Sequence, residues 1–147
     1  MIRILTVLWT LFWLGRISAE DIRSFTIPNR YMLAILPAAP FLSSVALPLR
    51  ILAALLPAVL IPLMGMGDVK LYGALGFCLG PAALLQIACA SMLAGGVCAG
   101  ILVMFKKAKK KDRIPFGPFI AAAAAVYYFL VFFVPFFAPF FPSTSAM

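Results

Sequence analysis

The apolar stretch AALLQIACASMLAGGVCAGILVMF at residues 82–105 decides the fold class of this chain. It carries no charged residue, and it exceeds the roughly 20 apolar residues that a helix needs to cross a bilayer. The rest of the 147-residue chain is similar, because 65% of all residues are hydrophobic and the mean hydropathy is +1.13. A water-soluble domain with one core does not reach such values. The sequence therefore predicts an all-α, polytopic bundle of transmembrane helices, with residues 1–147 forming a single membrane-embedded domain.

Turns and charged residues divide the chain into six expected spans. The fourth span is short, since about 11 residues make roughly 16 Å of helix, too little to cross a core of about 30 Å. Pro37 and Pro40 are expected to kink the second span. We expect loops or ends at 16–30, at a basic cytoplasmic segment 106–113 and at a frayed tail 142–147. The six predicted spans are 4–14, 31–47, 51–64, 69–79, 82–105 and 114–141.

The first span has a competing interpretation as a secretory signal peptide. Ile17-Ser18-Ala19 loosely resembles a small-residue cleavage site after a short hydrophobic region. Ile17 is large for the outer small-residue position, however, and Arg16 interrupts the approach to the site. Further membrane sequence follows instead of a secreted domain, so we expect the first span to be retained.

The basic residues set the expected orientation, because Lys and Arg in short loops mark the cytoplasmic side. Six spans place all Lys and Arg residues except Arg3 and Arg50 on one face, together with the 16–30 loop, Asp68 and the 106–113 segment. We expect that face to be cytoplasmic and both termini to be extracytoplasmic. The net charge of +8 could also indicate a nucleic-acid partner. Because the basic cluster lies where topology requires it, we expect membrane lipid and no nucleic acid as partner.

Several kinds of chemistry are excluded by residue types that are missing. The chain has no histidine, which removes Ser/His and Cys/His nucleophile pairs and histidine-based metal sites. Cys78, Cys89 and Cys98 are an odd number without CxxC spacing, and we interpret them as small packing residues. The sequence therefore predicts no metal site and no cofactor.

The acidic residues are few enough to consider one by one. They are Glu20, Asp21, Asp68 and Asp112, and an ionisable group at the edge of a membrane helix is costly enough to need a reason. Asp112 stands among basic residues and is interpreted as their solvated partner. Neighbouring residues on a helix differ by about 100°, so only one of Glu20 and Asp21 can face an interior site. We assign Glu20 to the wet side and predict that Asp21 and Asp68 form a pair at similar depth.

A pair of carboxyl groups points to aspartic protease chemistry. Two carboxylates a few ångströms apart share a proton, so that one acts as base toward a water and the other as acid toward a carbonyl. Gly65 and Gly67 flank Met66 ahead of Asp68 and would let a substrate strand come near the backbone. The alternative is that Gly-Met-Gly forms a simple turn in which Asp68 caps the next helix.

Small residues also recur along the 82–105 stretch. Ser91, Gly95 and Ala99 have four-residue spacing, and Gly96 and Gly100 stand beside them. Stripes of this kind let helices approach closely in a bilayer. We expect this face of the span to pack against another helix.

Three segments of the chain resemble the type IV prepilin peptidases, membrane aspartyl proteases with a GxGD motif. The segments are DIRSFTIPN at 21–29, GMGDVKL at 65–71 and PFGPF at 115–119. The resemblance implies that Asp21 and Asp68 are the catalytic pair. It implies supporting or substrate-binding roles for Gly65, Gly67, Lys70, Pro28, Asn29, Pro115, Gly117 and Pro118.

The same resemblance implies the substrate and the location. A prepilin or pseudopilin, which carries a short leader and a hydrophobic helix, would be cut at the cytoplasmic face of a bacterial inner membrane, usually just after a glycine. Larger family members carry a cytosolic domain with two CxxC pairs and methylate the new N-terminus, and this chain contains no such pair. It looks like the short, peptidase-only branch that serves tight-adherence (Flp) pili. Presenilin-like proteases are less similar, because no tyrosine precedes Asp21 and Pro-Phe-Gly-Pro stands where they have Pro-Ala-Leu.

Two other classes of function stay open from the residues alone. A small transporter or channel subunit could use Asp21 and Asp68 as proton-relay acids. Transporters usually show repeated halves, and neither motif has a second copy here. A structural assembly protein would leave the paired acids unexplained. The sequence indicates no particular oligomeric state.

Overall fold

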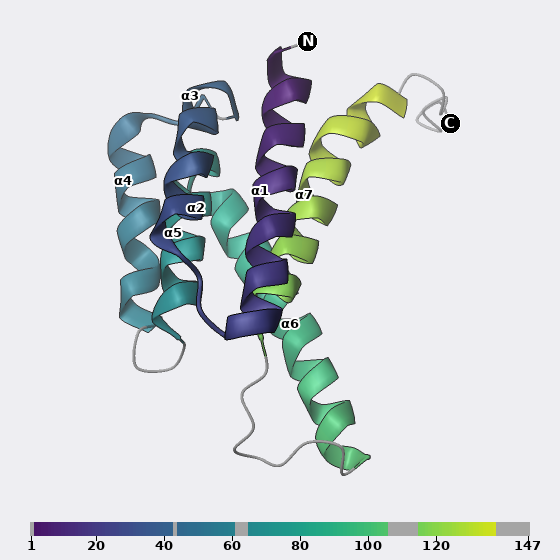
Figure 1. Cartoon of the computed structure of the whole chain (residues 1–147). Coiled ribbons are helices and arrows are strands. Elements are labelled where there is room, and N and C mark those ends of the chain that lie inside the picture. The colour runs from purple at the N-terminus through teal and green to yellow at the C-terminus, as the bar shows by residue number, and fades with distance from the viewer. Residues whose placement is uncertain (1, 43, 61–64, 106–114, 138–147) are drawn as a thin grey trace.

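The computed structural model describes residues 2–42, 44–60, 65–105 and 115–137, and all regular structure within these ranges is helical. The chain runs from the N-terminus at one end of a bundle and crosses it repeatedly (Figure 1). The all-α prediction is therefore confirmed for the described residues. The elements are α1 (Ile2–Ser24), α2 (Asn29–Ile35), the 3₁₀ turn η1 (Leu36–Ala38), α3 (Ala39–Leu42), α4 (Leu47–Leu55), the 3₁₀ segment η2 (Leu56–Leu60), α5 (Met66–Leu79), α6 (Pro81–Met104) and α7 (Gly117–Phe137).

Two helices of the described chain are long and apolar enough to cross a membrane. They are α1 and the Pro81–Leu102 part of α6. Only 17% and 22% of the most apolar 18-residue segments of α1 and α6 are buried inside the bundle. Most of their apolar surface therefore faces outward, as expected for helices in lipid. The number of spans stays a prediction.

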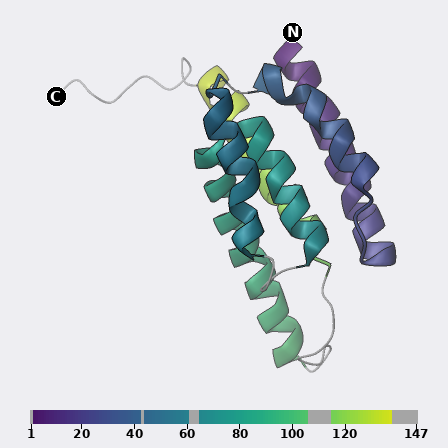
Figure 2. The same cartoon turned by 90° about the vertical axis from the view of Figure 1, so that its left-hand side faces the viewer.

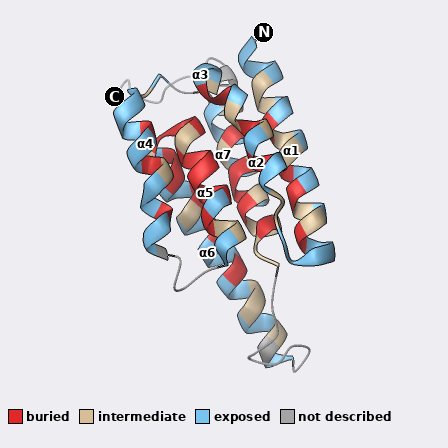
Figure 3. Cartoon of the chain, turned by 60° about the vertical axis from the view of Figure 1, so that its left-hand side comes forward, coloured by how far each residue is buried: buried red, intermediate tan, exposed pale blue. Residues whose placement is uncertain are grey.

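The centre of the bundle is α5, which is buried over most of its length (Figure 3). Helices α2, α3, α4 and α6 pack against it, while α1 packs mainly against α7. In the side view of Figure 2, α1 and the α2–α3 segment form one layer beside the remaining helices. The backbones of α4 and α5 come close, because a Cβ added at Gly76 would lie 2.5 Å from the Ala53 carbonyl oxygen. Glycine at this position allows the short helix α5, the fourth expected span, to sit inside the bundle.

The first helix is longer than the sequence predicted. We expected a span at 4–14 and a loop at 16–30, but α1 continues to Ser24. Its buried residues are Thr10, Leu14, Ile17 and Asp21, which share one helix face. The buried stripe thus continues past the charged Arg16, which stays exposed. The prediction of a loop was wrong because packing against neighbouring helices outweighed the local loss of hydrophobicity.

The second and third spans also have shifted boundaries. The second span begins with α2 at Asn29, and Pro28 is the N-cap just outside this helix. We had expected Pro28 to lie inside the first turn. The span breaks into a 3₁₀ turn around Pro37 and ends at Leu42 instead of 47, in agreement with the expected effect of proline.

Helix α4 begins at Leu47, so Arg50 lies within a helix and not in the loop ahead of it. The Arg50 side chain is buried, and its Nε donates a hydrogen bond of 2.7 Å to the Phe77 carbonyl oxygen near the end of α5. The guanidinium also lies 4.9 Å from the Phe77 ring centroid. A cation at this position satisfies a free carbonyl and complements the negative end of the helix dipole.

The later helices follow the prediction more closely. Helix α5, the expected fourth span, is short, with 14 residues. It begins at Met66 and so includes Gly67 and Asp68. It ends at Gly80, whose φ of 92° is in the left-handed region that favours glycine. Helix α6 matches the expected span at 82–105 within one residue. The last span begins at Gly117 instead of 114, and the basic segment 106–113 and the tail 142–147 lie outside the described residues.

The small residues of α6 divide into two groups. Ser91 is buried, with its hydroxyl 2.6 Å from the Tyr72 hydroxyl of α5, and a Cβ at Gly95 would lie 2.5 Å from the Phe116 ring. Gly96 and Gly100 have no atom within 4 Å of an added Cβ. Of the cysteines, Cys78 is buried as expected, whereas Cys89 is exposed and is therefore not a packing residue within this chain.

Candidate active site

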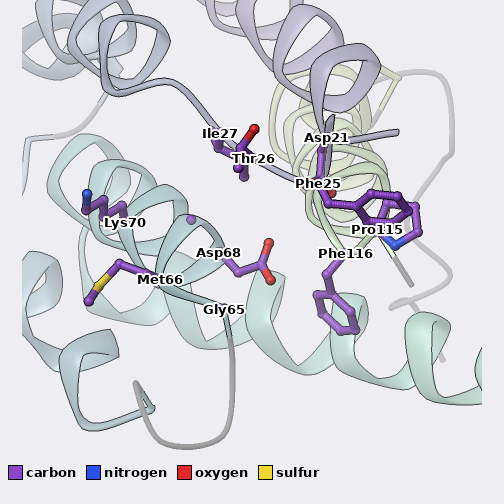
Figure 4. A pocket seen from close by; sticks show the side chains of 11 residues that line it. Asp21, Phe25, Thr26, Ile27, Gly65, Met66, Asp68, Lys70, Pro115 and Phe116 are labelled. Atoms are coloured by element: carbon purple, nitrogen blue, oxygen red, sulfur yellow. The ribbon is translucent and has the colours of Figure 1, made fainter. Parts of the chain in front are cut away.

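A pocket of about 650 Å³ opens where four segments of the bundle meet at one end. The end of α1, the connection to α2, the start of α5 and the segment leading into α7 all contribute (Figure 4). Segments that are far apart in the sequence therefore form one site. The lining residues are Asp21, Phe25, Thr26, Ile27, Gly65, Met66, Gly67, Asp68, Lys70, Pro115 and Phe116.

Asp21 reaches this pocket from the last turns of α1. Its side chain lies on the same buried face as Leu14 and Ile17 and is only 5% exposed. Glu20, the neighbouring acid, is half-buried and does not line the pocket. The structure thus places Asp21, and not Glu20, at the site, in keeping with the helical rotation used to choose between them.

The backbone of Gly117 holds the Asp21 carboxylate. The Gly117 N–H, at the start of α7, donates a hydrogen bond of 2.8 Å to Asp21 Oδ2. A Cβ added at Gly117 would lie 2.9 Å from the same oxygen and 3.1 Å from Asp21 Cβ. Only glycine allows the backbone this close, so α7 fixes the position of the α1 carboxylate across 96 residues of sequence.

Asp68 comes from the first turn of α5. The N-cap of this helix is Gly65, so Asp68 is the third helical residue and does not have the capping position that the simple-turn alternative required. An acid here is still favoured by the helix dipole. In Figure 4 its carboxylate points into the pocket below Asp21, so the two acids line the same pocket.

The two glycines before Asp68 keep this side of the pocket open. A Cβ at Gly65 would lie 3.4 Å from Asp68 Oδ2, and one at Gly67 would lie 3.3 Å from the Ile27 side chain. The second distance is tight, so Gly67 brings α5 close to the segment between α1 and α2. Neither Gly65 nor Gly67 has a positive φ. Glycine is therefore favoured at these positions by the close approach of neighbouring atoms and not by an unusual backbone angle.

The other residues singled out in the sequence lie around the pocket in different ways. Lys70 lines it, and its Nζ donates a hydrogen bond of 3.1 Å to Asn29 Oδ1, which joins α5 to α2. Pro115 lines it as well, whereas Pro28, Asn29 and Pro118 do not. Pro28 is instead the N-cap of α2, and Pro118 lies in the first turn of α7, a position that proline suits.

Five lining residues were not singled out from the sequence: Phe25, Thr26, Ile27, Met66 and Phe116. All of them fall inside the three motif segments, between or beside the residues chosen there, and this is the signal that could have found them. Phe25 has a φ of 51°, and its N–H donates to the Asp21 carbonyl oxygen at 2.9 Å. This geometry ends α1 at Ser24, about one turn after Asp21, and turns the chain along the pocket.

The site contains the two carboxylates of Asp21 and Asp68, and the Lys70 amine and the Thr26 hydroxyl also line the pocket. Within residues 2–42, 44–60, 65–105 and 115–137, no three acid or cysteine side chains gather as a metal site would require. Two facing carboxylates can take up and deliver protons, so the arrangement can carry acid–base chemistry. Fold and site together define a helical membrane protein with a paired-carboxylate pocket at one end of its bundle.

Comparison with known proteins identifies the family. The model of the type IV leader peptidase family matches residues 8–101, more than half of the chain and including Asp21 and Asp68. The chain belongs to the type IV leader peptidase family. It is also 41% identical over 66 residues to the prepilin leader peptidase/N-methyltransferase of Xanthomonas campestris pv. campestris. That match covers 45% of this chain and 23% of the relative, so the chain corresponds to only a part of that longer protein. No solved structure matches the chain.

Proposed function

We propose that this protein is an aspartic endopeptidase that removes the leader peptide of type IV prepilins or pseudopilins at a membrane surface. The observation that carries the proposal is the shared pocket of Asp21 and Asp68, which lie on different helices and belong to the segment matched by the family model. The named function of the relative, a prepilin leader peptidase, supports the substrate class.

The chemistry needs one protonated and one ionised carboxyl group. Two carboxylates in one pocket avoid carrying two charges by sharing a proton. The ionised group takes a proton from a water, whose oxygen attacks the scissile carbonyl carbon, while the protonated group delivers its proton to the carbonyl oxygen. The resulting diol collapses when a proton passes to the leaving nitrogen and the C–N bond breaks. The proton balance closes without a metal ion or a covalent intermediate.

Within this family the protein acts as a peptidase without N-methylation, on pilins of the tight-adherence (Flp) type. The support is compositional, because the printed sequence contains no CxxC pair. Mass spectrometry of the processed pilin N-terminus, from cells with and without this gene, tests both parts. A processed and unmethylated N-terminus is the expected product, and a processed N-terminus that carries a methyl group would contradict it.

The pocket faces the cytoplasm and the protein resides in the bacterial inner membrane. Basic residues support this orientation: Arg16, Arg23 and Lys70 lie on the pocket half of the helices, whereas Arg3 and Arg50 lie near the opposite end. Both termini are then extracytoplasmic. A reporter fused after Met147 should be extracytoplasmic and one inserted at 106–113 cytoplasmic, and the reverse pattern would contradict the orientation.

Substitution of the two acids tests the catalytic pair. Asparagine keeps the size of aspartate and one acceptor, but it cannot exchange the proton. Asp21→Asn and Asp68→Asn should each abolish cleavage of a synthetic prepilin by the purified protein at normal abundance in the membrane. The double variant should be no worse than either single one, because the pair acts as a unit.

Glu20→Gln is the matched control, because Glu20 adjoins Asp21 but does not line the pocket. It should retain most of the activity. Cleavage by either Asp variant, together with an inactive Glu20→Gln, would show that the wrong acid was chosen. Proton flux through liposomes without any cleavage would favour the relay alternative instead.

A further inference from the structure

A second cavity of about 700 Å³ lies along the flank of α5, between α2 on one side and α4 on the other. It is a groove on the outer surface of the bundle, and both flanking helices pack against α5. Lys70 is the single charged residue among its described lining residues. The groove is lined by Asn29, Met32, Leu33, Leu36, Ala54, Leu55, Ala58, Met66, Val69, Lys70, Gly73, Ala74 and Phe77.

The shape of the groove follows from the sizes of the side chains. Four of its lining residues are small, Ala54 and Ala58 from the α4 side and Gly73 and Ala74 from α5, and these four are called its floor. A Cβ at Gly73 would lie 2.9 Å from the Ala54 carbonyl oxygen, so α4 and α5 are already in backbone contact there. The rims carry larger residues, and Leu33 and Leu55 are each 64% exposed.

The groove adjoins the two-carboxylate pocket. Met66 and Lys70 line both cavities. From this junction the groove follows one face of α5 through Gly73 to Phe77, a length of roughly 16 Å or three helical turns. An elongated ligand could therefore lie along α5 and extend one end to Asp68 without leaving the protein surface.

The chemistry of the groove restricts what can occupy it. At the depth of a membrane helix, a peptide must satisfy its own backbone hydrogen bonds, so an extended strand is excluded and a helix is favoured. Small residues on the floor are what close helix packing requires. A lipid chain would also suit an apolar groove, but it would not account for the connection to the acid pocket.

We infer that this groove binds the apolar helix of the substrate, so that the scissile peptide bond just beyond the helix end enters the pocket of Asp21 and Asp68. The inference rests on the proposed function and specifies how the substrate is held. Helix docking in the groove determines affinity, and the acid pocket performs the cleavage. The two contributions are therefore separable by experiment.

Filling the groove provides the first test. Ala58 is exposed on its floor, and Ala58→Trp should occupy the space of the substrate helix. We expect KM for a helix-bearing prepilin to rise by at least about tenfold, the cost of displacing one buried leucine-sized group. A short peptide that spans the cleavage site but lacks the helix should be cut as by the unmodified protein. Ala122→Trp, at an exposed position of α7 outside both cavities, is the control and should match the unmodified protein on both substrates.

Photocrosslinking provides a second test that does not depend on activity. A benzophenone amino acid replaces Leu33 or Leu55 on the rims, or Leu93 on α6 as a control that is 70% exposed. In the full chain carrying Asp68→Asn, substrate-helix adducts should form at the first two positions and not at Leu93. Adducts with lipid alone, or equal substrate adducts at all three positions, would overturn the inference.

The outcomes also distinguish this inference from the proposed function. If the unmodified protein cuts neither substrate, the proposed function fails. If it cuts both, and Ala58→Trp leaves KM for the helix-bearing substrate unchanged, the groove does not hold the helix although the protein is a peptidase.

Discussion

The contact between Gly117 and Asp21 makes Gly117→Ala an informative perturbation of the site. The added methyl group would lie 2.9 Å from Asp21 Oδ2 and 3.1 to 3.2 Å from the next two side-chain carbons. Gly117 has no positive φ, since Phe25 and Gly80 are the described residues that do. Alanine can therefore adopt the backbone conformation, and the expected effect comes from contact with Asp21.

The magnitude follows from what the carboxylate must give up. Asp21 is 5% exposed and is carried on a packed helix, so its carboxylate moves only by straining α1 or by losing the 2.8 Å bond from the Gly117 N–H. A hydrogen bond to a charged group contributes about 1.5–3 kcal/mol, which corresponds to roughly 10- to 100-fold in rate. Displacement of a catalytic group by about 1 Å has an effect of similar size, about 100-fold.

Single-turnover cleavage of a prepilin by the purified variant is the appropriate assay. We expect kcat to fall by about 10- to 100-fold with little change in KM, because in the proposed mechanism Asp21 acts on the reacting atoms and does not hold the apolar helix. Gly96→Ala is the matched control, since nothing lies within 4 Å of its added Cβ, and it should cleave normally. If Gly117→Ala cleaves within about threefold of the unmodified protein, Gly117 does not position Asp21.

Three further predictions concern packing, the end of α5 and metal independence. Gly95→Leu should destabilise the protein in detergent by about 1–3 kcal/mol, because its Cβ would lie 2.5 Å from the Phe116 ring. Gly96→Leu should leave the melting temperature nearly unchanged, since nothing lies within 4 Å of its added Cβ. Equal melting temperatures for the two variants would place the small-residue face outside the packing interface. Arg50→Met should lower stability by about 1–2 kcal/mol through loss of the hydrogen bond to the Phe77 carbonyl, while exposed Arg3→Met should be neutral. Prepilin cleavage should be unchanged in a chelator, because the chain has no histidine and two carboxylates need no metal; activity lost in EDTA and restored by zinc would refute the carboxylate-pair mechanism.

Local composition was sufficient for the class of fold and for most of the helices. Apolar runs define α6 within one residue and the end of α5 at Leu79, although α5 begins three residues before the expected span, since hydropathy and helix length depend only on nearby sequence. The predicted helix boundaries were wrong at two places. Helix α1 continues through polar residues beyond Arg16, and α4 begins before the expected loop around Arg50 had ended. At both positions, contacts with other helices outweighed the local signal.

The choice of acids could also be predicted, because the chain has only four and a helix separates adjacent side chains by about 100°. The sequence could indicate Asp21 over Glu20 and pair it with Asp68. It could not show that the Gly117 amide contacts Asp21, or that Phe25, Thr26 and Phe116 line the same pocket. Those contacts join segments almost a hundred residues apart.

The sequence by itself predicted an all-helical membrane protein, its three motif segments and the pairing of Asp21 with Asp68, which line one pocket in the structure. Only the tertiary structure decided which faces of the helices meet. These contacts let the Gly117 amide of α7 hold Asp21, and they form the groove along α5 that adjoins the pocket. The physical reason is that hydrophobicity and helix propensity are properties of neighbouring residues. The rotation and close approach of helices depend instead on side-chain sizes that meet only after the chain has folded, such as Gly73 against the Ala54 backbone and Gly117 against Asp21.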